Sequence, residues 1–261
     1  MNDQRPTNAK LASDPELAAA PALLARFKVA LNLSMMSIIV LAVIFFAEGR
    51  WFDPELFAIQ PQSLGGLLGV VTAPLLHGSA EHLFNNAFSI LVLGTLAGTV
   101  YPRATKRALP LIWLLSGLGT WLIAPAGGAH LGASGVIHGL GFMVFALGLL
   151  RRDRPAIAAT MIAFFFFGSM LLTVLPQELG VSWEYHLSGG LAGLLAAVLW
   201  RRADPPPPRR RYSWEDEPEP DPETDMLEPP SPEQVPVLWQ RPPPDVDNVL
   251  PFTPRDRDSV N

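Results

Sequence analysis

Cysteine is absent from the 261 residues, and charged side chains make up only 16% of them. The lack of thiols excludes disulfides, thiolate catalysis and zinc–thiolate sites. The chain also has no His-Glu-x-x-His pair and no acidic residue in the middle of an apolar block, which disfavours the zinc and aspartyl types of protease chemistry. We therefore expect neither a metal nor another cofactor.

Positive charge is too sparse for a nucleic-acid surface. The formal net charge is -5, but residues 1–200 carry 11 basic and 10 acidic side chains, whereas residues 201–261 carry 8 and 14. The acidity therefore belongs to the C-terminal part, and no basic surface is left for nucleic acid. We expect no nucleic-acid partner.

Apolar residues, by contrast, make up 49% of the chain and are grouped in blocks. Each of six blocks is near the length that crosses about 30 Å of hydrocarbon. The sequence therefore predicts an all-α, polytopic protein of the lipid bilayer with spans at about 29–47, 82–100, 109–124, 134–150, 156–175 and 185–200. A further apolar stretch, 65–76, is short and contains Pro74, so we expect a partly embedded loop there instead of a seventh span.

Basic residues in the connections indicate the orientation. One side would hold Arg26, Lys28, Arg103, Lys106, Arg107, Arg151, Arg152, Arg154, Arg201 and Arg202, whereas the opposite side would hold Arg50 alone. The positive-inside bias then places both termini in the cytoplasm, in the plasma or inner membrane. An even number of spans fits this result.

Three regions follow from the composition. Residues 1–28 are a polar cytoplasmic segment in which Asp14-Pro15 favours the start of a short interfacial helix. Residues 29–200 are the membrane domain. Residues 201–261 combine many prolines with Asp and Glu, so we expect a disordered cytoplasmic tail, with a solvated linker and a ligand for a tail-binding partner both open.

Ser134 opens the fourth block within the stretch Gly132-Ala133-Ser134-Gly135. Small residues in membrane helices commonly serve close packing, so this stretch alone indicates little. The predicted topology adds to it, because blocks two, four and six all enter the membrane from the outer side. At a rise of 1.5 Å per residue, their polar residues lie within about 10 Å of the outer helix ends; these residues are His82, Asn86, Ser134 and His186.

These side chains suit acyl transfer. His186 would be the general base for a Ser134 nucleophile. His82 and Asn86, spaced i and i+4, share a helix face and could stabilise an oxyanion together with the Ser134 amide. Polar contacts between helices and a carbonyl-bonded histidine are the structural alternatives. No carboxylate suits a third triad position, so a Ser–His dyad is predicted.

His138 offers another candidate base. It lies four residues after Ser134, and helical side chains lean toward the N-terminus, so its ring could reach the serine. We expect His186 to be the base and treat His138 as the alternative. Separate alanine variants distinguish them, since the base is the histidine whose loss abolishes activity.

Residues 76–200 resemble the rhomboid intramembrane serine proteases. The resemblance rests on the run from His77 through His82 to Asn86, on Gly132-Ala133-Ser134-Gly135, and on His186 followed by Gly190 and Gly193. It implies a six-helix rhomboid-like bundle with Ser134 as nucleophile and His186 as base. It also implies an oxyanion site at His82, Asn86 and the Ser134 amide, and a structural role for His77.

Two features depart from the family pattern. A Trp-Arg pair common in the first outer loop is Leu68-Gly69 here, and the position of His138 is more often an aromatic residue that would stack on the base. The resemblance implies an endopeptidase that cleaves transmembrane segments of other membrane proteins. A catalytically silent relative that binds or escorts membrane helices is the alternative. A transporter is disfavoured because blocks one, three and five lack ionisable residues at depth.

Overall fold

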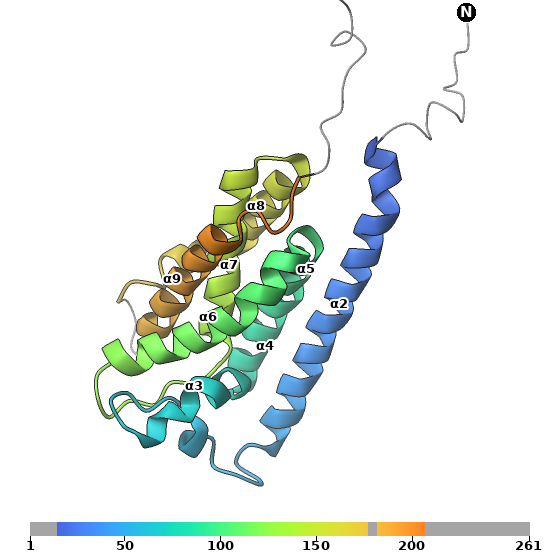
Figure 1. Cartoon of the computed structure of the whole chain (residues 1–261). Helices are drawn as coiled ribbons and strands as arrows, with labels where there is room; N and C mark the ends of the chain where they lie inside the picture. The colour runs from blue at the N-terminus through green and yellow to red at the C-terminus, as the bar shows by residue number, and fades with distance from the viewer. Residues whose placement is uncertain (1–14, 177–181, 207–261) are drawn as a thin grey trace, which may run out of the picture. The chain divides into compact units, whose positions relative to one another are not determined.

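The computed structural model describes residues 15–176 and 182–206, and this part of the chain consists of helices and loops without a named strand. Each of the six apolar blocks contains a helix, which confirms the all-α class. In chain order these are α2 (Pro15–Ala47), α4 (Ala80–Ser89) continued by the π-helix η4 (Ile90–Gly94) and by α5 (Thr95–Val100), α6 (Pro102–Ile123), α7 (Ser134–Arg151), α8 (Arg154–Phe167) continued by the 3-10 helix η5 (Gly168–Leu171), and α9 (Trp183–Trp200) (Figure 1).

Three helical stretches within this part are long and apolar enough to cross a membrane. They are Ala20–Ala47, Ala80–Val100 and Ser134–Arg151, with mean hydropathies of 2.5, 1.5 and 1.5. The apolar stretch Arg154–Met170 is shorter. These helices support a membrane protein, and the crossing of the bilayer by all six blocks stays a prediction.

α2 is one continuous helix of 33 residues. The sequence predicts a separate interfacial helix before the first span, but the helix that begins at Pro15 runs without a break to Ala47. α2 packs along α5, η4 and α4 (Figure 1). Small residues allow this approach, since a Cβ at Gly98 would lie 2.8 Å from the Ala30 methyl group.

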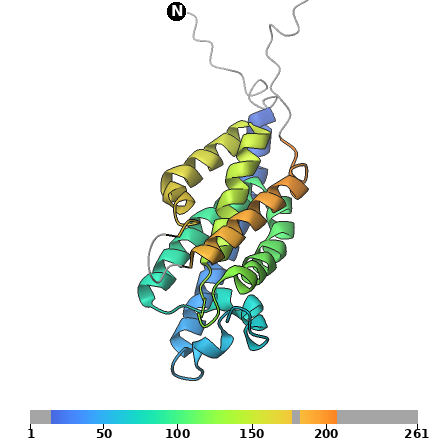
Figure 2. The same cartoon turned by 90° about the vertical axis from the view of Figure 1, so that its left-hand side faces the viewer.

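α7 lies among the other helices and packs against α6, α8 and α9, and α6 packs against α9 (Figure 2). The buried side chains of α7, which are Met143, Val144 and Leu147, pack with Ile112 of α6 and Leu93 of η4 in one apolar cluster. The closest seam is between α7 and α9, where a Cβ at Gly193 would collide with the carbonyl oxygen of Gly139. Glycine at this crossing therefore sets the separation of α7 and α9.

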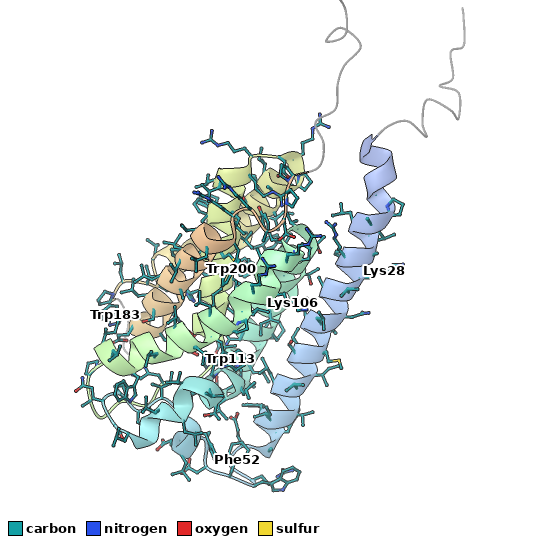
Figure 3. The ribbon with its side chains drawn as sticks, viewed as in Figure 1. Lys28, Phe52, Lys106, Trp113, Trp183 and Trp200 are labelled. Carbon is teal, nitrogen blue, oxygen red and sulfur yellow. The ribbon has the colours of Figure 1, made fainter. Side chains whose placement is uncertain are left out.

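The connection from 48 to 79 folds into short helices instead of a seventh span. They are the 3-10 helices η1 (Pro54–Phe57), η2 (Gly65–Leu67) and η3 (Ala73–Leu75) and the single turn α3 (Gly69–Thr72). α3 packs on α6, where the Trp113 indole donates a hydrogen bond of 3.0 Å to the Val71 carbonyl (Figure 3). A pair of backbone hydrogen bonds, each 2.9 Å long, joins Ile59 to His130. These contacts hold the connection over the end of the bundle where α7 and α9 begin.

The folded part extends a few residues past α9. The carboxylate of Asp204 accepts hydrogen bonds from the backbone N–H groups of Arg103 (3.1 Å) and Ala104 (2.8 Å), so it caps the start of α6. Asp204 is buried. The residues just after 200, which the sequence assigns to the tail, are thus attached to the bundle, and the predicted disordered tail from 207 onward lies outside the described residues.

Candidate active site

Ser134 is the first residue of α7, as its sequence context predicts, and its side chain is half-buried. Gly132, two residues earlier, has φ +113, a conformation that favours glycine. Its N–H donates a 2.8 Å hydrogen bond to the Ala73 carbonyl. A Cβ at Gly132 would lie 2.5 Å from the His82 ring, so glycine also leaves room for that ring.

α7 and α9 touch backbone to backbone beside Ser134. A Cβ at Gly189 would overlap the carbonyl of Gly135, and a Cβ at Gly135 would meet the Tyr185 ring at 2.5 Å. His186 lies on the first turn of α9 and is buried. Glycine at 135 and at 189 therefore lets the helices of Ser134 and His186 approach each other at the ends where these two residues lie. Gly190, on the next turn, packs against the Phe142 ring.

His186 stacks on His138. The two imidazole rings are 3.8 Å apart between centroids and nearly parallel, with an interplanar angle of 11°. The family resemblance implies an aromatic ring stacked on the base at this position, and here a histidine supplies the stack. His138 therefore contacts His186 directly.

Both ring nitrogens of His138 are engaged. Nδ1 lies 2.7 Å from the Ser134 carbonyl oxygen, and Nε2 lies 2.9 Å from the Thr173 hydroxyl. A carbonyl only accepts, so Nδ1 carries the proton and Nε2 accepts from the hydroxyl. With no free lone pair, His138 is poorly placed to take a proton from the Ser134 hydroxyl.

His186 has one nitrogen engaged. Its Nδ1 lies 3.1 Å from the Thr173 carbonyl oxygen, which again requires an Nδ1–H donor. Its Nε2 then keeps a lone pair, as a general base needs. No hydrogen bond joins the Ser134 hydroxyl to His186 among the described residues; their link runs through the ring of His138. Sequence reasoning missed Thr173, which no motif marks.

His82 and Asn86 lie beside the turn that precedes Ser134. A Cβ at Gly132 would meet the His82 Nε2 at 2.6 Å and the Asn86 Nδ2 at 3.4 Å. Asn86 is buried, and its Nδ2 lies 3.0 Å from the His77 Nε2. The amide therefore donates one hydrogen to His77 and keeps its second N–H for another acceptor.

His77 contacts both residues of this pair. Its ring packs edge-on against the His82 ring at 5.1 Å. Burial, and secondarily the nearby His82, lower the pKa of His77 to about 4, so the ring stays neutral and Nε2 can accept from Asn86. Its backbone N–H donates to both carboxylate oxygens of Glu48, at 3.1 and 3.3 Å. No motif in the sequence marks Glu48 for this contact.

Glu48 is partly desolvated at this contact. Burial raises the pKa of Glu48, and the hydrogen bond from the His77 backbone opposes that shift. The carboxylate fastens the end of α2 to the segment that carries His77. A chain of contacts thus runs from Glu48 through His77 to Asn86.

The remaining outer-end histidine, His130, lies apart from these rings. Its Nδ1 is 2.6 Å from the Ser182 hydroxyl, next to the start of α9. Burial lowers the pKa of His130, and the neighbouring Glu184 opposes that shift. This histidine joins the loop before α7 to the start of α9.

These features define a helical membrane protein in which Ser134, His82, Asn86 and His186 lie near the beginnings of α4, α7 and α9. The Rhomboid domain model matches residues 64–203, more than half of the chain. The chain belongs to the rhomboid family.

Several proteins of known sequence are similar to this chain. A mycobacterial protein from Mycobacterium tuberculosis, named only as uncharacterized, is 41% identical over 149 residues, covering 54% of this chain and 62% of the relative. One from Mycobacterium leprae is 35% identical over 141 residues, covering 51% and 56%. A protein of Acanthamoeba polyphaga mimivirus whose name includes the word rhomboid is 25% identical over 169 residues, covering 62% and 87%. The chain thus spans less than two thirds of the length of the mycobacterial relatives.

Proposed function

We propose that this chain is an intramembrane serine endopeptidase that cleaves transmembrane segments of other membrane proteins. The observation that carries the proposal is the placement of Ser134 at the start of α7 and of His186 on the first turn of α9, where the two helices touch backbone to backbone and the His186 ring stacks on His138. Membership of the rhomboid family supports the proposal, because this is a family of intramembrane serine proteases. The family also has inactive members, so membership alone does not establish activity.

In this proposal the Ser134 hydroxyl attacks the scissile carbonyl. The His186 Nε2 takes the serine proton and returns it to the leaving amine, and water then hydrolyses the acyl-enzyme. His186 would approach the serine hydroxyl on substrate binding, because hydrogen bonds between catalytic groups often shorten only in the enzyme–substrate complex.

The tetrahedral oxyanion would form beside the Gly132 turn. The free amide hydrogen of Asn86, a ring N–H of His82 and the backbone N–H of Ser134 are the proposed donors. Ser134 begins a helix, and the first N–H groups of a helix have no partner within the helix. Its amide is therefore available for a ligand.

The substrate class follows from the environment. A transmembrane helix hides its carbonyl groups in its own hydrogen bonds, so it must unwind locally before attack. Gly or Pro near its outer end would lower the cost of unwinding. We place the enzyme in the plasma or inner membrane with six spans, both termini in the cytoplasm and the site near the outer face, because the inner side then carries the basic residues.

The test uses purified protein in detergent and a model transmembrane substrate. We expect cleavage and labelling by a fluorophosphonate probe, both lost in Ser134→Ala. Ser37→Ala is the matched control, because the Ser37 hydroxyl bonds only the Leu33 carbonyl within α2. Cleavage by Ser134→Ala would overturn the assignment of the nucleophile.

A catalytically silent helix-binding protein is the second candidate. The absence of a Ser134–His186 hydrogen bond in the described part of the chain favours it. Folded wild-type protein that binds transmembrane peptides but takes up no probe would establish this alternative. If instead His186→Ala keeps activity and His138→Ala loses it, the two histidines exchange roles.

A further inference from the structure

We propose that Thr173 is a positioning residue for His186, an inference that rests on the function proposed above. Thr173 lies in the connection that follows η5, and it contacts both stacked rings. Its hydroxyl is 2.9 Å from the His138 Nε2, and its carbonyl oxygen is 3.1 Å from the His186 Nδ1. Thr173 therefore hydrogen-bonds one ring nitrogen of His138 and one of His186.

The carbonyl of Thr173 would do what the acidic member does in a Ser-His-Asp triad. That member orients the imidazole and keeps the proton on Nδ1. Among the described residues no carboxylate hydrogen-bonds His186, whereas the Thr173 carbonyl does. A carbonyl selects the same tautomer, but it stabilises the imidazolium less because it carries no net charge.

The hydroxyl of Thr173 fixes where that carbonyl lies. Because the His138 Nδ1–H is committed to the Ser134 carbonyl, Nε2 must accept, and the hydroxyl must donate to it. The same hydroxyl is 3.0 Å from the Met170 carbonyl, a competing acceptor for its single proton. His138 thereby ties the connection after η5 to α7, and the Thr173 carbonyl is brought to His186.

A purely space-filling role for Thr173 predicts something different. Valine has nearly the shape of threonine and would fill the same space, whereas serine keeps the hydroxyl and loses the methyl group. If packing matters, Thr173→Val is tolerated and Thr173→Ser is not. If the hydroxyl group matters, Thr173→Ser is tolerated and Thr173→Val is not.

The kinetic test compares these two variants in purified full-length protein with a transmembrane model substrate. We expect Thr173→Val to lower kcat by about 3- to 10-fold with little change in KM, the effect of losing about one hydrogen bond. Thr173→Ser should stay within about 2-fold of wild type. Thr99→Val is the control, because the Thr99 hydroxyl bonds only the Thr95 carbonyl inside its own helix.

A double-mutant cycle assigns the effect to His138. In a His138→Phe background, which keeps a stacked ring without nitrogens, Thr173→Val should change kcat no further. Wild-type kcat in Thr173→Val, or fully additive effects in the cycle, would overturn the inference. An equal decrease of kcat in Thr173→Ser and Thr173→Val would overturn the inference as well.

Nitrogen NMR of histidine-labelled protein separates this inference from the proposed function, because it requires no activity. We expect the His186 signals, identified by their loss in His186→Ala, to show the Nδ1–H tautomer, and Thr173→Val to shift them toward a mixture. An Nε2–H tautomer in wild type would overturn the role of Thr173 even if the protein is a protease. Protein without activity that still shows the Thr173-dependent tautomer would overturn the proposed function alone.

Discussion

At the scale of single residues, burial distinguishes two adjacent asparagines. Asn86 is buried against His77 and lies beside Gly132, whereas the side chain of Asn85 is exposed on α4. The two have the same chemistry and the same helix. Their difference in position therefore isolates the contribution of a donor aimed at the site from the general effect of an asparagine in α4.

We expect Asn86→Ala to lower kcat for a model substrate by about 100- to 1000-fold, because it removes one of the proposed oxyanion donors. Asn85→Ala, the matched control, should stay near wild type. Steady-state kinetics on both variants checks this. Equal losses in the two variants would show that Asn86 contributes no more to catalysis than its exposed neighbour.

The lowered pKa of His77 should make the stability of the folded protein depend on pH. Its ordinary pKa of 6.5 falls to about 4 in the folded protein. Between these values the unfolded chain binds a proton that the folded chain does not, so stability decreases as pH falls from about 6.5 toward 4. In His77→Gln, whose side-chain oxygen can still accept from Asn86, thermal midpoints should fall less between pH 7 and 4.5. Identical pH profiles for the two proteins would contradict this assignment.

At the scale of elements, the seam between α7 and α9 sets the geometry of the site. A methyl group at Gly189 would overlap the Gly135 backbone, whereas one at Gly141 would reach ordinary contact with Leu93 at 3.6 Å. Within a helix, alanine is more stable than glycine by about 1 kcal/mol. We therefore expect alanine to destabilise the protein at Gly189, where the helices touch, but not at Gly141.

Gly189→Ala should destabilise the protein by about 1–3 kcal/mol, the usual cost of overpacking, and should reduce activity because α7 and α9 separate. Gly141→Ala should be neutral or stabilising. Thermal unfolding in detergent, read with cleavage rates, measures both. Unchanged stability in Gly189→Ala would mean that the backbone contact relaxes easily.

Some elements could be predicted and others could not, for physical reasons. Hydropathy predicted a helix in each apolar block, and the position of Ser134 at the beginning of the fourth block predicted the start of α7. The π-helix η4 between α4 and α5 has no sequence signature. Thr173 acts partly through a main-chain carbonyl, which any residue has, and Glu48 reaches His77 across a loop. Neither contact follows from spacing.

At the scale of the whole described domain, Asp204 joins the end of α9 to the start of α6. We expect Asp204→Ala to destabilise the protein by about 0.5–2 kcal/mol, the usual effect of losing a helix cap, and Asp204→Ser to recover most of it. Denaturation of both variants in one detergent checks the difference. Equal losses would indicate that the charge of Asp204 matters more than its capping bonds.

Glu48 lies outside the stretch that matches the Rhomboid domain model, residues 64–203, yet its carboxylate holds the His77 backbone. A fragment trimmed to the borders of that match would lose α2 together with this anchor. Family boundaries drawn from sequence similarity are therefore a poor guide for choosing the smallest stably folded piece of this protein, which should include α2.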